Sequence, residues 1–183
     1  MNYIILDLEA TCWDGDRTRQ NEIIEIGAQK VSNEFGELKI ASEFAAFVKP
    51  KLNPVLSDFC KNLTSIKQED VNVCPQFPIV FKQFREWIGT EPYVLCSWGK
   101  YDKNQFEKDC KLHHISTNWL KNHISLKHQY MDQFNVKGRD AGMSAALRKF
   151  GLKLDGTHHR GIDDAKNITK IFIKNFDNWE FPC

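Results

Sequence analysis

The first part of the chain alternates short apolar runs with polar breaks, a pattern that predicts β-strands joined by turns. Strands are expected at residues 4–9, 22–31 and 38–49, with a polar loop over 11–21 and a turn at 34–37. Because the links are short, the three strands are expected to pair as an antiparallel meander.

The remainder of the chain is predicted to be mainly helical. Helices are expected at 57–62, 78–88, 102–111, 144–150 and 162–176, with a short buried strand at 93–97. A capping box over Ser65 to Gln68 would open a further short turn. Residues 112–140 show no clear pattern, and short helices and loops are expected there. This order of elements predicts one α/β domain over 1–183 with a mixed sheet.

Composition limits the class of protein without indicating a function. Hydrophobic residues make up 42% of the chain and charged residues 27%, as in an ordinary globular protein. The apolar stretch at the N-terminus stops at Asp7 and has no basic region before it, so we expect neither a signal peptide nor a membrane span, and a cytoplasmic protein. The net charge of +1 neither favours nor excludes a nucleic-acid partner.

Most of the cysteines and histidines lack the spacing of metal ligands. The absence of a C-x-x-C pair favours reduced thiols packed in the core for Cys12, Cys60, Cys74, Cys96, Cys110 and Cys183. Surface positions are expected for His113, His114, His123 and His128.

Two carboxylates interrupt the first predicted strand. Asp7 and Glu9 lie two residues apart, so their side chains project from the same face of the strand as Ile5. Two anions near an apolar core repel each other and stay ionised only if cations, such as a metal ion, compensate them. In the alternative, the strand is an edge strand and both carboxylates lie in water. This stretch alone supports the two interpretations equally.

Two further segments contain residues that could bind a metal or act in catalysis. Asp102 follows the predicted strand 93–97 at a helix start, and ligands of open α/β sheets bind beyond the carboxyl ends of strands. Asp164 lies in the first turns of the last predicted helix, and His159 lies five residues earlier, on the preceding loop. His159 could then be a mobile base beside Asp164, a fixed metal ligand. The alternatives are acids that cap a helix or complement its dipole, and a solvated pair formed by His158 and His159.

Together these motifs match a known family. The chain resembles the DEDDh group of 3′-to-5′ exonucleases, which have a ribonuclease-H-like fold. Asp7 and Glu9 match its D-x-E motif, Asp102 matches its middle acid, and His159 and Asp164 match its closing H-x4-D motif, in the order of the family.

Three segments of the sequence resemble one branch of that group more closely. Residues 7–13, 56–64 and 161–167 look like the exoribonuclease branch that trims histone-mRNA ends and small RNAs, and like its bacterial relatives. One position departs from the branch, where a Trp directly precedes the middle acid. Here Tyr101 is in that place and Trp98 lies three residues earlier, so either could stack on a base.

The resemblance implies an architecture and a reaction. The fold would be a mixed five-stranded sheet flanked by helices, with its first three strands forming the antiparallel meander. Two Mg²⁺ ions, which Mn²⁺ can replace, would be held by Asp7, Glu9, Asp102 and Asp164. His159 would act as the general base, and nucleoside 5′-monophosphates would leave the 3′ end of single-stranded RNA.

The resemblance also assigns substrate contacts. The terminal ribose would meet Glu9, Ala10 and Thr11, and His159 would also contact the substrate. The last base would stack on Phe59 and on either Trp98 or Tyr101, with ordinary core packing as the alternative for these aromatic residues. The candidate phosphate contacts, with solvated surface charge as the alternative, are Lys100, Lys103, Lys137 and Arg139.

Two rival functions remain at this point. A DNA exonuclease would share the fold, since RNA is told from DNA through its 2′-hydroxyl and no identifiable residue settles that contact. A non-catalytic binding or regulatory protein would be expected to lack one of the acids or the histidine, and all five are present. The expected partner is single-stranded nucleic acid, with RNA favoured over DNA, and neither a membrane nor an obligate protein partner is indicated.

Overall fold

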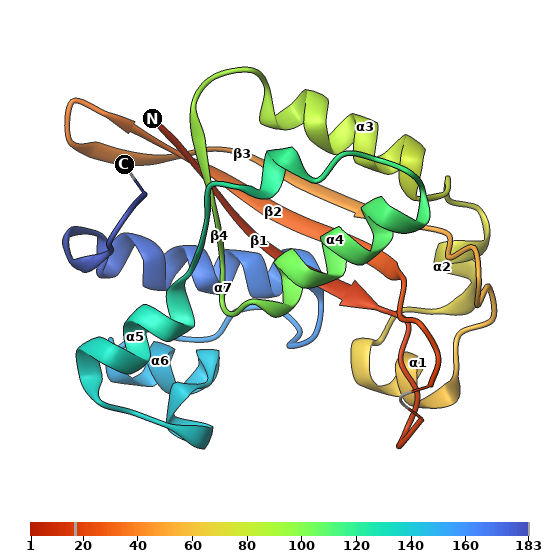
Figure 1. The fold of residues 1–183 in the computed structure, drawn as a ribbon. Coiled ribbons are helices and arrows are strands. Elements are labelled where there is room, and N and C mark those ends of the chain that lie inside the picture. The colour runs from red at the N-terminus through yellow and green to blue at the C-terminus, as the bar shows by residue number, and fades with distance from the viewer. Residues whose placement is uncertain (17, 183) are drawn as a thin grey trace.

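The computed structural model describes residues 1–16 and 18–182. Its centre is a five-stranded sheet with strand order β3-β2-β1-β4-β5 (Figure 1). The strands are β1 (Asn2–Ala10), β2 (Ile23–Glu34), β3 (Glu37–Phe47), β4 (Tyr93–Ser97) and β5 (His123–Ser125). The first three pair antiparallel, whereas β4 pairs parallel with both β1 and β5. The predicted mixed five-stranded sheet with its antiparallel meander is confirmed.

The position of β1 decides between the two interpretations of the first strand. It lies between β2 and β4, so it is a central strand and the interpretation as a wet edge strand is wrong. Its apolar residues are almost completely buried on both faces of the sheet. A carboxylate on this strand therefore lies next to the core.

Within the described residues, seven α-helices flank the sheet. They are α1 (Asp58–Thr64), α2 (Gln68–Asn72), α3 (Phe77–Ile88), α4 (Tyr101–Leu112), α5 (Leu126–Phe134), α6 (Met143–Lys149) and α7 (Gly161–Lys174). Short 3-10 helices lie at Asn118–Leu120, Gly138–Ala141 and Phe176–Asn178. The five predicted helices are confirmed, with ends that differ by one or two residues.

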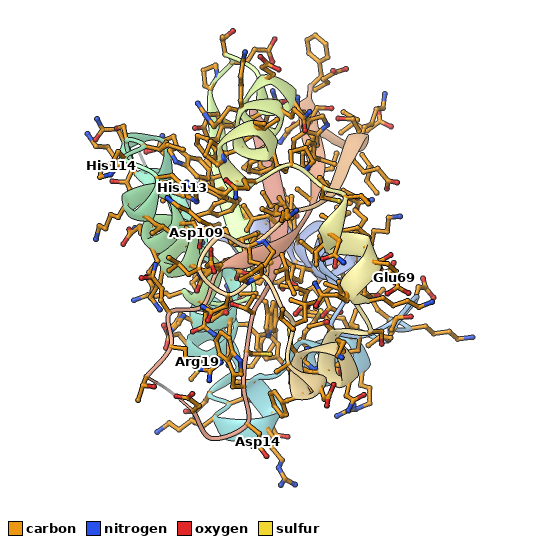
Figure 2. All side chains as sticks on the ribbon, turned by 90° about the vertical axis from the view of Figure 1, so that its right-hand side faces the viewer. Asp14, Arg19, Glu69, Asp109, His113 and His114 are labelled. Carbon is orange, nitrogen blue, oxygen red and sulfur yellow. The ribbon has the colours of Figure 1, made fainter. Side chains whose placement is uncertain are left out.

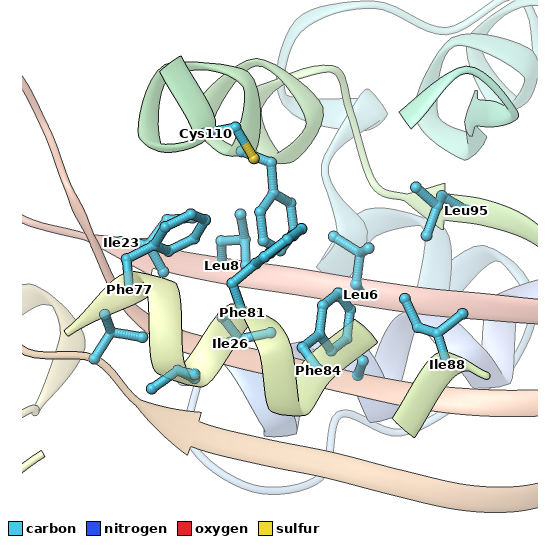
Figure 3. Packing of buried hydrophobic residues seen from close by; sticks show 14 of the residues in the cluster. Leu6, Leu8, Ile23, Ile26, Phe77, Phe81, Phe84, Ile88, Leu95 and Cys110 are labelled. Carbon is cyan, nitrogen blue, oxygen red and sulfur yellow. The ribbon is translucent and has the colours of Figure 1, made fainter. Parts of the chain in front are cut away.

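Each face of the sheet has its own hydrophobic core. On one face, Leu6 and Leu8 of β1 pack with residues of α3, including Phe84 (Figure 3). The Phe84 ring stacks on that of Phe106 of α4, with centroids 5.7 Å apart. On the other face, Ile5 packs with residues of α5, α6 and α7. Since Asp7 and Glu9 have the parity of Ile5, they project from the face that α7 covers.

Two predictions about local structure were wrong, and a third was incomplete. The unpatterned stretch 112–140 contains the short strand β5 as well as helices and loops. Ser65 ends α1 in the left-handed region, with φ of 60°, and opens no capping box. Instead the N–H of Lys67 donates to Asp70 Oδ2 at 2.9 Å, where α2 begins. His123 is half-buried in β5 and lies 2.9 Å from Ser97 Oγ, so it is no simple surface residue.

The described cysteines are free thiols, as predicted, but only three of the five lie in the core. Cys60, Cys96 and Cys110 are buried, Cys12 and Cys74 are half-buried, and all five are free thiols. Cys183 lies outside the described residues, as does Arg17 in the predicted loop. Among the residues described, no helix has both the length and the apolar character needed to cross a membrane.

Candidate active site

The end of β1 brings its two acids to a point where three elements meet. Glu9 is only 7% exposed, and Asp7 is partly buried. The register between β1 and β2 shifts directly after Glu9, and a bulge of this kind redirects the side chains next to it. The strand lies close to the start of α7, since a Cβ on Gly161 would be 3.1 Å from the Asp7 carbonyl oxygen.

The third acid, Asp164, comes from the first turn of α7 and is buried. One carboxylate oxygen from each of Asp7, Glu9 and Asp164 lies within 4.8 Å of the other two. Three carboxylates at this separation can share a bound cation. The structure thus brings together three of the four acids that the sequence predicts.

An ion pair holds the N-terminus of α7 in this place. Glu25 of β2 is buried, and its carboxylate accepts hydrogen bonds from the Arg160 guanidinium, at 3.2 Å, and from the Gly161 N–H, at 2.9 Å. Both donors lie at the start of the helix, ahead of Asp164. Glu25 therefore positions an acid of the site without belonging to the predicted motifs.

Asp102 occupies a different place at the same cavity. It lies in the first turn of α4, is 5% exposed, and accepts a hydrogen bond from the Leu8 N–H at 3.1 Å. It is not one of the three acids whose oxygens lie within 4.8 Å. The bond to β1 shows that Asp102 is more than a helix cap, because it ties α4 to the strand between Asp7 and Glu9.

Burial and mutual repulsion shift the titration of these acids. Burial raises the pKa of Asp7 well above its ordinary value, and the charges of Asp102 and Glu9 raise it further. Burial, followed by the charge of Asp164, raises the pKa of Glu9 to about 8. Burial is also the main cause that raises the pKa of Asp102 to about 6. A bound cation would offset this repulsion, and four carboxylates form an oxygen-only ligand set that suits Mg²⁺ or Mn²⁺.

Two histidines, not one, lie beside Asp164. His158 Nδ1 is 3.0 Å from Asp164 Oδ2, and the backbone N–H of His159 donates to the same oxygen at 3.0 Å. The two imidazole rings stack with their centroids 4.0 Å apart. Burial, followed by the charge of His158, lowers the pKa of His159. His158 was missed as a site residue, although the adjacent pair His158–His159 was its signal in the sequence.

These groups line one cavity of about 710 Å³. Asp7, Glu9, Ala10, Asp102, His159 and Asp164 all contribute to its wall, as do His158, Lys100 and Cys12. The catalytic residues predicted from three separate motifs therefore face a common space. Their individual roles remain predictions.

Both aromatic candidates for base stacking line the same cavity. Trp98 is held by a hydrogen bond from its Nε1–H to the Ala141 carbonyl, at 3.1 Å, and its ring packs 5.5 Å from that of Tyr130. Tyr101 is 52% exposed. Both residues line the cavity, Trp98 with a ring held in place and Tyr101 with an exposed ring, so the structure does not choose between them.

Most of the other predicted substrate contacts do not line this cavity. Phe59 on α1 is 41% exposed, so core packing is the wrong interpretation for it, and it does not line the cavity. Thr11 is buried and bonds Glu22 twice: its backbone N–H donates to the Glu22 carbonyl, and its hydroxyl accepts from the Glu22 N–H. Lys100 lines the cavity, whereas three of the predicted phosphate contacts do not: Lys103, Lys137 and Arg139.

Comparison with known proteins agrees with the fold and the site. Residues 4–172 match the family model described as exonuclease. The 3'-5' exoribonuclease 1 of Rattus norvegicus is 32% identical over 179 residues, which cover 93% of this chain and 51% of that protein. The 3'-5' exonuclease eri1 of Schizosaccharomyces pombe is 30% identical over 211 residues, covering 98% of this chain and 70% of the relative.

A solved structure gives the same result in three dimensions. The nuclease domain of 3'hExo, described as a DEDDh family member bound to rAMP, superposes with a TM-score of 0.91 at 29% identity, covering 100% of this chain and 96% of that one. The chain belongs to the exonuclease family, and its predicted place among the DEDDh proteins is confirmed. It spans about half the length, 51%, of the rat relative.

Proposed function

We propose that this chain is a metal-dependent 3′-to-5′ exoribonuclease that releases nucleoside 5′-monophosphates from the 3′ end of single-stranded RNA. The observation that carries the proposal is the convergence of Asp7, Glu9 and Asp164 within 4.8 Å at one cavity, with Asp102 on its wall. Repelling buried carboxylates are costly to a fold, and a divalent-cation site explains why they are kept together.

The four acids would hold two Mg²⁺ ions, which Mn²⁺ can replace. Asp7 would be a central ligand of this set, because the charges of Asp102, Glu9 and Asp164 all act on its carboxylate and raise its pKa. When bound, such ions polarise the phosphoryl group and stabilise charge on the attacking and leaving oxygens. Glu25 keeps α7, and thereby Asp164, in position through the Gly161 N–H.

His159 is the proposed general base, which takes the proton of the attacking water on an imidazole nitrogen. It lies on the cavity wall, and its lowered pKa favours the neutral form that can accept a proton. The backbone N–H of the same residue bonds Asp164, so the base is held next to a metal ligand. His158, whose ring nitrogen lies 3.0 Å from the same Asp164 oxygen, would help to fix that carboxylate.

Recognition of a chain end is proposed to involve the end of β1. The Glu9 carboxylate and Ala10 face the cavity and would meet the terminal ribose. Thr11 would act mainly by fixing the strand end, since its N–H and hydroxyl are both bonded to Glu22. RNA is the preferred substrate in this proposal because the relatives are named exoribonucleases and the solved nuclease domain of 3'hExo is bound to rAMP.

The proposal is tested with the purified chain and 5′-labelled single-stranded RNA and DNA of one sequence, in Mg²⁺ or EDTA. The expected result is a Mg²⁺-dependent ladder of shortened RNA that Asp7→Asn abolishes. Asp58→Asn is the matched control, because it removes an acid whose side chain is 93% exposed and lies outside the cavity. No ladder on either substrate would overturn the proposed enzyme, and a preference for DNA would overturn the choice of RNA.

A further inference from the structure

A second cavity, of about 610 Å³, lies between the loop that precedes β2 and the C-terminal half of α4. Three of the side chains that line it are cationic, and none is acidic. We call this cavity the basic groove; its residues are Thr18, Arg19, Gln20, Asn21, Lys108, Lys111 and Leu112. Figure 2 shows Arg19 of the loop and Asp109 of α4 on the same side of the molecule.

The two walls of the basic groove are fixed to each other. Gln105 of α4 donates from Nε2 to the Asn21 carbonyl at 2.9 Å. One turn further along α4, the buried Asp109 accepts a hydrogen bond from the N–H of Ile23, where β2 begins, at 3.2 Å. These bonds hold the loop against the helix, so the cationic side chains are presented from a preformed frame.

The stability of the fold explains the lysines of the basic groove only in part, because the charge of Lys108 lowers the pKa of the neighbouring buried Asp109, against the larger effect of burial, whereas no such role is found in the described part of the chain for Lys111 beyond the helix end. Lys108 and Lys111 are exposed and lie three residues apart on α4, and like charges at this spacing destabilise a helix by a few tenths of a kcal/mol. Among the ion pairs of the described residues, neither lysine takes part. Lys111 complements the helix dipole in the last turn, but Lys108 lies a turn earlier and does not. A polyanionic ligand would use both.

The basic groove lies within reach of a strand that enters the active site. Asp102, at the cavity of the acidic cluster, and Lys108 are on the same helix, six residues or roughly 9 Å apart along its axis, and Lys111 is roughly 14 Å from Asp102. On the other wall, Asn21 donates from Nδ2 to the carbonyl of Thr11, which follows the strand end at Ala10. One single strand could therefore contact both cavities.

We propose that the basic groove binds the phosphodiester backbone of the same single strand, several nucleotides upstream of the nucleotide that is removed. This proposal rests on the proposed function for the direction of the strand. The groove offers positive charge and polar amides without aromatic side chains, which suits backbone phosphates and not bases. Binding in the basic groove would extend the substrate contacts beyond the terminal nucleotide.

The test compares Lys108→Ala/Lys111→Ala with the wild type on a dinucleotide and on an RNA of about twelve nucleotides, since only the longer strand reaches the groove. We expect KM for the longer strand to rise about tenfold, with the slope of log affinity against log salt reduced by about 1–2, while hydrolysis of the dinucleotide is unchanged. Lys39→Ala/Lys82→Ala removes the same charge from β3 and α3 and should behave like the wild type.

Binding of the longer strand in EDTA, measured by fluorescence anisotropy, separates this proposal from the proposed activity. A chain that binds through the lysines but hydrolyses nothing would support the basic groove and overturn the exoribonuclease. Unchanged KM, affinity and salt slope in the double variant would overturn the basic groove alone. An equal loss on the dinucleotide would also overturn it, because the lysines would then act at the active site or on the fold; a thermal melt of each variant checks the fold.

Discussion

Gly27 of β2 and Gly161 of α7 lie in backbone-to-backbone contact directly beside the acidic cluster. A Cβ on Gly27 would be 2.1 Å from the carbonyl carbon of Gly161, a distance that no rotation of a side chain relieves. Gly27 is also the residue paired with Asp7 across the sheet. The missing side chains therefore allow α7 to bring Asp164 up to Asp7.

Gly27→Ala should damage both stability and activity. The added methyl group must push α7 away from β2, which we expect to cost about 3 kcal/mol or more of the free energy of unfolding and to separate Asp164 from Asp7. Urea unfolding measures the first effect and nuclease activity the second. Gly99→Ala is the control, because the nearest atom to its added Cβ is 3.9 Å away, and its free energy of unfolding should change by less than about 0.5 kcal/mol. Equal stabilities of the two variants would contradict the contact.

Glu25→Ala should lower stability and weaken metal binding, although Glu25 is not one of the predicted metal ligands. Removing this buried carboxylate leaves Arg160 and the Gly161 N–H without their partner, at a cost of about 2–4 kcal/mol in the free energy of unfolding. Since Asp164 lies in the same helix turn, we also expect weaker Mg²⁺ binding by calorimetry.

The control for that change is Glu43→Ala, which removes an acid whose ion pair with α7 is exposed. Its partner is Lys166, at 3.1 Å, and both side chains are substantially exposed, so the loss should be about 0–1 kcal/mol. If both variants bound Mg²⁺ like the wild type, Glu25 would have no part in positioning Asp164.

Local sequence patterns were sufficient wherever a residue acts with its neighbours in sequence. The period-two pattern places Asp7 and Glu9 on one strand face, and the three- and four-residue spacing of apolar residues predicts α3 with its buried Phe84. Both predictions depend only on the geometry of a single element. The structure confirms both elements.

Apart from His158 and the start of α2, the features that were missed depend on contacts between distant segments. The strand β5 has three residues and is defined by its pairing with β4, which no short pattern encodes. The bond from the Leu8 N–H to Asp102 joins residues 94 positions apart, and that from Gly161 to Glu25 joins residues 136 apart. Their partners become apparent only after the chain is folded.

The metal-free protein should lose stability as the pH rises. Folding raises the pKa of Glu9 to about 8 and that of Asp102 to about 6, so the folded state binds more protons than the unfolded state between about pH 4 and pH 8. Stability is therefore highest at the acidic end of this window and falls as these acids ionise.

The measurement is the free energy of unfolding in EDTA across that pH range. Saturating Mg²⁺ should reverse much of the decline, because the cation binds the ionised carboxylates of the folded state only. Glu9→Gln should flatten the metal-free curve at its upper end. A stability that rises with pH in EDTA would contradict the raised pKa values.

The adjacent histidines should differ sharply when each is replaced by Asn. His159→Asn removes the proposed base and is expected to lower kcat by about 10²–10⁴, whereas His158→Asn leaves the bond from the His159 N–H to Asp164 and should lower it less than tenfold. Because the charge of His158 helps to lower the pKa of His159, its removal should also move the acidic limb of the pH–rate profile upward. Profiles of kcat/KM at saturating Mg²⁺ measure both effects. A His159 variant with near-normal kcat would exclude that residue as the base, and an unmoved acidic limb in the His158 variant would show that the stacked rings titrate independently.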